Sequence, residues 1–362
     1  MDYEKTLEWM FRQIPMYQRT GKAGYKVDLG KTLEMDEYFG HPHKTFKTIH
    51  VAGTNGKGSV SHILAAVLQS AGYKTALYTS PHLKDFRERI KVNGEMVDKE
   101  FVINFIEEHK EYFMDIAPSF FEMSVAMAFD YFRRQQVDIA VVEVGMGGRL
   151  DSTNIITPEV AAITNIGLDH TQFLGNSLDM IAWEKAGTIK KSIPVVIGET
   201  AMETEPVFRE MAEKMDAHLC FADQELTIAN KQLIDELFHQ YDVFRGDAVY
   251  LEGLQTDLLG NYQSRNIVTA LKVIEKLQEK GYSLSEENIR GGIKKKKKIT
   301  GFHGRWIVLG RHPLQVCDTA HNREGLVYIM EQIREMNKPA LHFVLGFVND
   351  KNLDNVLDLF PR

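Results

Sequence analysis

The chain has 362 residues, and its 43 lysines and arginines against 50 aspartates and glutamates give a net charge of −7 at pH 7. A composition of 44% hydrophobic and 26% charged residues is typical of a folded globular protein and excludes a largely disordered chain, and the length suggests two domains. The acidic balance argues against a protein that holds nucleic acid through its charge.

Neither the cysteines nor the hydrophobic runs indicate an extracellular or membrane protein. Cys220 and Cys317 are too far apart to suggest a disulfide framework or a cysteine zinc site. The charged N-terminus does not resemble a signal peptide, and no run approaches the roughly 18 apolar residues that span a bilayer. We expect a cytoplasmic protein that has neither a membrane nor a nucleic-acid partner.

Apolar runs alternate with stretches of helical periodicity, which predicts an α/β fold. A strand at residues 48–52 leads into a glycine-rich turn and a helix, and a second strand follows at residues 74–78. The nearly continuous apolar run at residues 139–144 is typical of a parallel strand that is buried on both faces. Further strands are predicted at residues 160–164 and 194–197, and helices at residues 101–110, 123–134 and 264–281.

A second unit is expected after five consecutive lysines at residues 294–298. We interpret these lysines as a solvated helix end that leads into a linker; contact with nucleic acid or anionic lipid is the alternative, which nothing else in the chain supports. The pattern then predicts strands at residues 306–309, 314–317 and 341–345 and a helix at residues 325–336. We expect a P-loop domain with a parallel central sheet over residues 1–298 and a smaller, apparently incomplete Rossmann-like domain over residues 299–362.

The glycine-rich turn is the first candidate binding site. A loop of this kind between a strand and a helix directs backbone N–H groups and the helix dipole at a phosphate. Lys57 is expected to reach the outer phosphates and the Ser59 hydroxyl to lie near a metal ion. The match to a P-loop is inexact because Gly58 separates these two residues, and a plain tight turn is the alternative. The predicted phosphate-binding residues are Gly53, Thr54, Asn55, Gly56, Lys57, Gly58 and Ser59.

Polar side chains that follow two further strands suggest a metal site beside this loop. Glu143 ends the strand at residues 139–144, and His170 follows the strand at residues 160–164. The carboxyl ends of parallel strands carry the ligand-binding groups of α/β sheets. Both residues could hold a divalent cation near bound phosphates, although a lone histidine often has only a structural role.

Eight motifs together carry a family resemblance. Their order and spacing resemble those of the folylpolyglutamate synthase/dihydrofolate synthase family, within the Mur ligase superfamily of ATP-dependent amide-forming enzymes. The resemblance runs from about residue 16 to the end; the phosphate loop and EKAG are shared across the superfamily, whereas SPHL and GGRLDSTN indicate the folate branch. The motifs are GTNGKGS (53–59), SPHL (80–83), EVGMGGRLDSTN (143–154), TNIGLDH (164–170), EKAG (184–187), GNYQ (260–263), GRW (304–306) and DTAHN (318–322).

The resemblance implies ATP and Mg²⁺ as cofactors. Lys185 matches a lysine that becomes carbamylated in the family, which would turn an ammonium into an anionic oxygen ligand; a plain amine that contacts phosphate is the alternative. The implied metal-binding residues are Ser59, Ser80, Glu143, His170 and Lys185. Further implied ATP contacts are Asn261, Arg305 and Asp318, and the implied catalytic residues are Lys57, Lys185, His170 and His321.

The resemblance also implies a pterin-binding region, to which Phe120, Phe121, Glu122, Leu150, Asp151 and Ser152 would contribute. Aromatic rings can stack on a flat pterin, but core packing is an equally good explanation of the two phenylalanines. The family usually has alanine where this chain has Ser152 and glycine where it has Thr319.

The implied reaction joins L-glutamate to dihydropteroate or a reduced folate, in an enzyme expected to be a monomer. A substrate carboxylate attacks the γ-phosphate of ATP to give an acyl phosphate, and the amino group of glutamate then displaces phosphate. Three alternatives remain open at this point: another Mur-type ligase that acts on a cell-wall nucleotide, a P-loop NTPase that makes no amide, and an inactive fragment.

Overall fold

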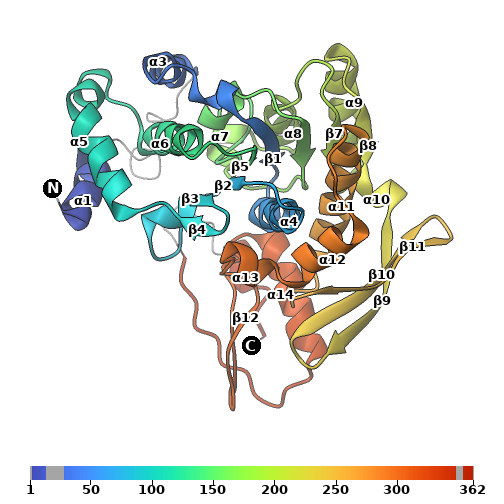
Figure 1. Cartoon of the computed structure of the whole chain (residues 1–362). Coiled ribbons are helices and arrows are strands. Elements are labelled where there is room, and N and C mark those ends of the chain that lie inside the picture. The colour runs from blue at the N-terminus through green and yellow to red at the C-terminus, as the bar shows by residue number, and fades with distance from the viewer. Residues whose placement is uncertain (1, 14–27, 348–353, 362) are drawn as a thin grey trace.

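An eight-stranded sheet forms the centre of the protein, as the computed structural model shows for residues 2–13, 28–347 and 354–361 (Figure 1). The strand order is β4-β3-β2-β5-β1-β6-β7-β8. β2 and all strands from β5 to β8 run parallel to β1, whereas β3 pairs antiparallel with both β2 and β4. The strands are β1 (Lys47–Ala52), β2 (Thr75–Tyr78), β3 (Ile90–Val92), β4 (Glu95–Met96), β5 (Ile139–Glu143), β6 (Val160–Ile163), β7 (Val195–Ile197) and β8 (Leu219–Phe221). The predicted parallel α/β sheet is therefore confirmed.

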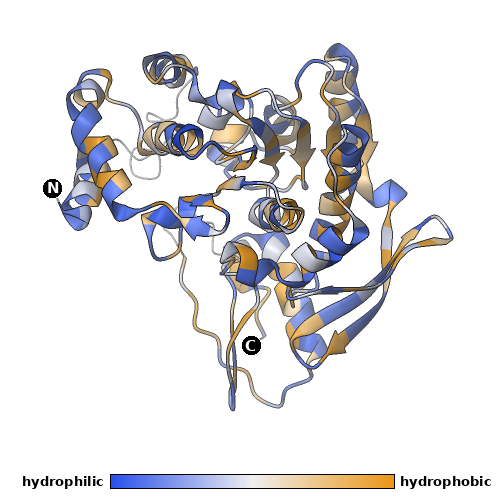
Figure 2. Ribbon diagram, viewed as in Figure 1, coloured by the Kyte–Doolittle hydropathy of each residue, from blue (hydrophilic) through white to orange (hydrophobic). Residues whose placement is uncertain are grey.

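Helices cover both faces of this sheet because its strands are apolar on both faces. In β5, Ile139 and Val141 join the core beneath α4 (Lys57–Ser70), α11 (Gln263–Glu279) and α12 (Glu286–Lys294). Ala140 and Val142 join the opposite core, together with α6 (Phe120–Arg134). Figure 2 shows that the helices around the sheet carry both hydrophobic and hydrophilic residues.

The remaining helices extend this second layer or connect its elements. The longer ones are α1 (Tyr3–Gln13), α3 (Gly30–Tyr38), α5 (Lys99–Ile116), α8 (Leu178–Ala186) and α9 (Glu205–Lys214). The short ones are η2 (Pro42–Thr45), η3 (Phe86–Arg89), η4 (Ser152–Ile155), α7 (Thr171–Leu174) and α10 (Ala222–Glu225). Within the described ranges, no helix is both long enough and apolar enough to cross a membrane.

A three-stranded antiparallel sheet, which the sequence reading missed, lies beside α11 and α12 (Figure 1). It consists of β9 (Thr227–Ile234), β10 (Phe238–Arg245) and β11 (Ala248–Thr256). Alternate side chains of β10 are buried, among them His239, Tyr241 and Val243. This alternation is the pattern of a strand that is half buried.

The second, smaller unit contains α13 (Lys296–Thr300), a hairpin of β12 (Ile307–Arg311) and β13 (Leu314–Cys317), α14 (Arg323–Glu335) and α15 (Asp354–Leu357). The predicted strand at residues 341–345 is wrong: residues 341–347 have no regular secondary structure, none of the strands in the described part of the chain pairs with them, and Val344 is 100% exposed. The proposed boundary after residue 298 falls inside α13 and stays a prediction.

The lysine run is not simply a solvated helix end. Lys294, Lys295 and Lys298 are exposed, but Lys296 is 0% exposed, and its ammonium lies 3.6 Å from the centre of the Phe302 ring. The solvated interpretation is therefore wrong for Lys296, because α13 packs against α4 and turns this side chain inward. Burial lowers the pKa of Lys296 well below its ordinary value.

Candidate functional site

The glycine-rich loop joins the end of β1 to the first turn of α4, as predicted. Gly53 has φ +144° and Gly56 has φ +86°. A Cβ atom on Gly53 would lie 1.8 Å from Oγ1 of Thr164, and one on Gly56 would lie 2.1 Å from Oδ1 of Asn266. The loop thus needs glycine at both positions, for backbone conformation and for space.

Two lysine ammonium groups converge on this loop. Lys57 Nζ donates to the carbonyl oxygens of Gly53 and Thr54, each at 3.0 Å, and Lys185 Nζ donates to the same Gly53 oxygen at 2.9 Å. Lys185 comes from α8, and its side chain is 4% exposed. Burial lowers the pKa of Lys57, and burial together with the charge of Lys57 lowers the pKa of Lys185 to about 7. Lys57, which is half-buried, and Lys185, when it is protonated, place positive charge at this loop and suit it to an anion.

Glu143 and Ser80 lie together beside the N-terminus of α4. The Ser80 backbone N–H donates to Oε2 of Glu143 at 3.0 Å, and a Cβ on Gly58 would be 3.7 Å from Oε1 of Glu143. Burial raises the pKa of the Glu143 carboxyl, while the nearby positive charge of Lys57 opposes that shift. One buried carboxylate near a phosphate loop fits Mg²⁺, which usually binds one or two carboxylates plus phosphate oxygens.

The loop after β6 brings Asp169, rather than His170 alone, toward the phosphate loop. Asp169 acts on the pKa values of both Lys57 and Lys185 and raises them, against the effect of burial. His170 begins α7 with φ +51°, and its backbone N–H donates to the Asp169 carboxylate at 2.8 Å. Among the residues that the structure describes, no three His, Cys, Asp or Glu side chains form a metal-binding group, so the five-residue metal set stays a prediction.

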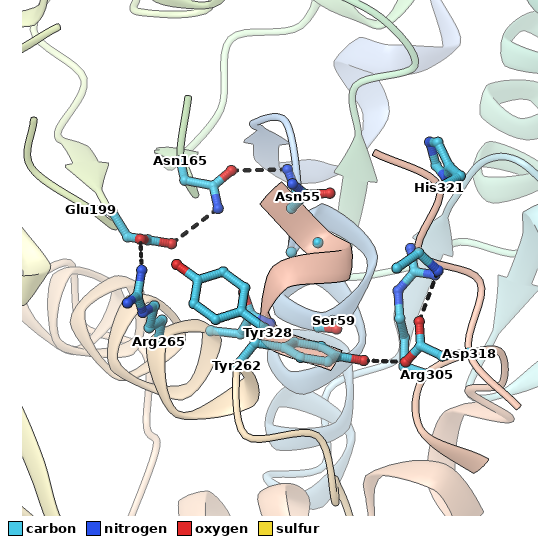
Figure 3. A pocket seen from close by; sticks show the side chains of 14 residues that line it. Asn55, Ser59, Asn165, Glu199, Tyr262, Arg265, Arg305, Asp318, His321 and Tyr328 are labelled. Carbon is cyan, nitrogen blue, oxygen red and sulfur yellow. Dashed lines mark hydrogen bonds and ion pairs between the residues drawn. The ribbon is translucent and has the colours of Figure 1, made fainter. Parts of the chain in front are cut away.

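A cleft lies between the phosphate loop and the second unit, and side chains from both line it (Figure 3). Of the predicted ATP-binding and catalytic residues, Asn55, Gly56, Ser59, Arg305, Asp318 and His321 line it. The other lining residues are Asn165, Glu199, Tyr262, Arg265, Asn266, Ala320, Gly325 and Tyr328.

Asp318 is held in a defined orientation at one side of the cleft. It accepts hydrogen bonds from the Tyr262 hydroxyl at 2.6 Å, the Trp306 backbone N–H at 2.7 Å and the Ala320 backbone N–H at 2.8 Å. Burial and the Asp318 charge raise the pKa of the Tyr262 hydroxyl, which therefore stays a donor. Arg305 lies beside Asp318 in Figure 3 and lines the same cleft. Both residues thus reach the phosphate loop from the second unit.

The opposite wall is a chain of polar contacts that the sequence reading missed (Figure 3). The Asn55 backbone N–H donates to Oδ1 of Asn165 at 2.9 Å, and Asn165 Nδ2 donates to Glu199 at 3.0 Å. Arg265 donates to the other oxygen of Glu199, and its guanidinium lies 4.7 Å from the centre of the Tyr328 ring. Glu199 could have been found, because it follows the strand at residues 194–197 at the carboxyl edge of the sheet.

Comparison with known proteins places this geometry in a family. Residues 51–274 match the model of the Mur ligase middle domain. The chain is 34% identical to the dihydrofolate synthase/folylpolyglutamate synthase of Bacillus subtilis, over 98% of this chain and 82% of that protein. The chain belongs to the folylpolyglutamate synthase/dihydrofolate synthase family. Like other Mur-type ligases, it is an ATP-dependent ligase.

Two solved structures show the same fold with ligands bound. The FPGS–AMPPCP–folate complex has 30% identity and a TM-score of 0.85, covering 94% of this chain and 82% of that one. Escherichia coli FolC in complex with DHPP and ADP has 28% identity and a TM-score of 0.84, covering 99% and 81%. The family therefore includes members that bind an ATP analogue together with folate.

One ATP contact implied by the family resemblance lies outside the cleft. The Asn261 side-chain amide donates to Glu335 at 2.8 Å and accepts from Lys231, while its backbone N–H donates to Gln332 at 2.7 Å. The residue joins α14 to the first unit and is absent from the cleft lining. Its neighbour Tyr262 lines the cleft instead.

Two of the expected pterin-binding residues have structural roles in this family member. Phe120 is 7% exposed and stacks on Phe11 with ring centres 4.8 Å apart, so the core-packing alternative holds for it. Glu122 accepts the Ser119 backbone N–H at 2.6 Å, and Ser119 Oγ accepts the Glu122 backbone N–H at 3.2 Å, which makes the pair a capping box for α6.

The other expected pterin-binding residues surround the loop after β5. The Phe121 ring covers Gly145, on which a Cβ would lie 2.4 Å from the ring. Asp151 accepts the backbone N–H groups of Met146 and Thr153, each at 3.0 Å, and so holds this loop in shape rather than presenting a free carboxylate. Burial raises the pKa of Asp151. Ser152 is buried and Leu150 is half-buried beside it.

Proposed function

We propose that this ligase joins the amino group of L-glutamate to a carboxyl group of dihydropteroate or a reduced folate, with release of ADP and phosphate. The observation that carries the proposal is the cleft between the phosphate loop and the second unit, where Gly56 and Ser59 of the loop and Arg305 of the second unit line a common space. The family relationship supports the substrate class, since relatives are named for folate glutamylation.

The two chemical steps need positioning and charge neutralisation more than a covalent enzyme intermediate. A carboxylate oxygen of the pterin substrate forms a bond to the γ-phosphorus, and the bond from that phosphorus to ADP breaks. The glutamate nitrogen then attacks the acyl carbon, loses a proton, and displaces inorganic phosphate. Lys57 and the loop N–H groups would bind the phosphates, and Arg305 would neutralise charge from the second unit.

A magnesium ion would be held by Glu143 and by hydroxyl groups such as those of Ser59 and Ser80. When bound, it would supply further neutralisation of phosphate charge. His170 and a modified Lys185 complete the proposed set. Lys185 suits modification because a pKa of about 7 leaves much of its amine neutral at physiological pH. The neutral nitrogen would attack carbon dioxide, form an N–C bond and release a proton, giving a carbamate.

The substrate would approach along the loop after β5, past Phe121, Leu150 and Ser152. We further propose that residues 1–298 and 299–362 act as two domains that enclose ATP, in a protein that works as a monomer without a nucleic-acid partner. Closure would exclude water from an acyl phosphate that is otherwise hydrolysed.

An ADP-release assay with systematic omission of substrates tests the proposal. We expect ADP only when L-glutamate and either dihydropteroate or tetrahydrofolate are both present, with the Lys57→Ala variant as the inactive control. ADP release in the absence of both L-glutamate and the pterin substrate would indicate an NTPase instead. Release that requires a cell-wall nucleotide would indicate a different Mur-type ligase.

A further inference from the structure

The side chain of Asn322 joins three segments that the proposed reaction requires to be aligned. Its Nδ2 donates to Oδ1 of Asn55 at 3.0 Å and to Oδ2 of Asp169 at 3.2 Å. Its Oδ1 accepts from Nδ2 of Asn55 at 3.2 Å and from the Gly325 backbone N–H at 2.9 Å. Asn322 is buried, so these four hydrogen bonds use its amide fully.

Each partner of Asn322 belongs to a different part of the site. Asn55 lies in the phosphate loop, Asp169 lies in the loop after β6, and Gly325 lies in the first turn of α14, which Asn322 caps. Asp169 also acts on the pKa values of Lys57 and Lys185. The reciprocal amide pair between Asn55 and Asn322 therefore connects the second unit to the groups that surround the phosphates.

A second contact holds the same turn of α14 against the loop after β6. Oε1 of Glu324 accepts the Leu168 backbone N–H at 3.1 Å, and a Cβ on Gly167 would lie 3.3 Å from the Glu324 carboxyl carbon. Ala320, His321 and Gly325, which flank Asn322, all line the cleft. The position of Asn322 thus sets how closely these cleft-lining groups approach the phosphate loop.

We propose that Asn322 is a positioning residue, which seats the second unit against the phosphate loop through its amide pair with Asn55. The inference rests on the proposed function, because it assumes that the cleft binds ATP. A helix cap alone would need only an oxygen that accepts the Gly325 N–H, and serine provides one. The two hydrogen bonds that Nδ2 donates are what a cap does not require.

The test is a double-mutant cycle on binding of the ATP analogue AMPPCP, with Asn322→Ser and Asn55→Ala. Asn322→Ser retains a capping oxygen but is too short to reach Asn55 or Asp169. We expect each single variant to bind AMPPCP about tenfold more weakly than the native protein. The double variant should bind AMPPCP no more weakly than whichever single variant has the lower affinity. The melting temperature of Asn322→Ser should be close to that of the native protein. If Asn322 had a purely structural role, the substitution would lower the melting temperature, and its effect on AMPPCP binding would be independent of Asn55→Ala.

Gln332 provides a matched control at the other end of α14. Its Nε2 donates to the Leu259 carbonyl at 2.8 Å, so Gln332→Ala loosens the same helix without touching the phosphate loop. The effects of Gln332→Ala and Asn55→Ala should multiply independently. Equal coupling in both cycles, or independent effects of Asn55→Ala and Asn322→Ser, would overturn the inference, as would unchanged AMPPCP affinity in Asn322→Ser.

Two additions keep the result interpretable. Asn322→Asp serves as the second variant if Asn322→Ser does not fold. It retains the size and the cap but loses both donors beside Asp169, so it should bind AMPPCP at least tenfold more weakly than the native protein does. In the ADP-release assay, kcat should fall about tenfold while KM for L-glutamate is unchanged. If the native protein binds AMPPCP but forms no glutamyl product, the proposed function fails, while the binding cycle still decides the role of Asn322.

Discussion

Replacing Lys185 with methionine should stabilise the folded protein at neutral pH while abolishing its activity. The Lys185 amine is buried, with a pKa of about 7 in the folded protein against 10.5 in the unfolded chain. This difference corresponds to a penalty of about 5 kcal/mol for folding with a charged amine. The penalty is complete below pH 7 and declines as the pH rises toward 10.5, because only the unfolded chain binds the proton in that window.

Methionine removes this penalty but also the hydrogen bond to the Gly53 carbonyl, which contributes about 1 kcal/mol. The variant should therefore exceed the native protein in free energy of unfolding by about 4 kcal/mol at pH 6 and by about 1 kcal/mol at pH 9. Urea denaturation of both proteins at several pH values measures the difference, in buffers free of carbon dioxide. A difference independent of pH would refute the depressed pKa and, with it, the reason that Lys185 is suited to carbamylation.

Three further substitutions test the loop and the cleft. Lys57→Ala should lower kcat by a factor of 100 or more, about 3 kcal/mol in the barrier, with the fold retained; unchanged kcat would contradict the phosphate-loop assignment. Arg305→Ala should slow amide formation severely. In the native protein, energy transfer between the two units should detect a shorter distance between them when AMPPCP binds. If Arg305→Ala binds AMPPCP with wild-type affinity and the distance between the units does not change, Arg305 does not close the second unit over the nucleotide. Gly56→Ala should lower the free energy of unfolding by well over about 1 kcal/mol, because the new Cβ would meet Asn266. The control Gly72→Ala has φ +90° and no atom within 4 Å of the new Cβ, so it should cost only about 1 kcal/mol of backbone strain. Equal losses of stability in the two variants would show that crowding at the loop is unimportant.

The elements around the phosphate loop could be predicted because their patterns are local. The apolar run that contains Val141 and Val142 is buried on both faces, and the loop before Lys57 needs glycine at residues 53 and 56. The sheet of β9–β11 was missed although buried and exposed residues alternate along β10. The exposed polar residues of these strands interrupt the apolar runs by which strands are recognised in the sequence. The strand expected at residues 341–345 did not form, since strand propensity alone is insufficient and no strand among the described residues pairs with this segment.

The site was harder to predict, because its roles depend on contacts between residues distant in the chain. Phe120 and Glu122 have residue types suited to a pterin, but the packing of Phe11 and the cap at Ser119 decide what they do. Lys296 belongs to a charged run, and only the packing of α13 shows that it is buried. Asn322 was part of a recognised motif, but its pairing with Asn55 spans 267 positions and has no local signature.

The most direct measurement of the central claim follows oxygen from substrate to phosphate. Dihydropteroate or a reduced folate labelled with ¹⁸O in its carboxyl group would be incubated with the protein, ATP, Mg²⁺ and L-glutamate, and the released phosphate analysed by mass spectrometry. An acyl phosphate requires one ¹⁸O atom in each phosphate formed together with a glutamyl product. Unlabelled phosphate, or phosphate released without amide formation, would contradict the account.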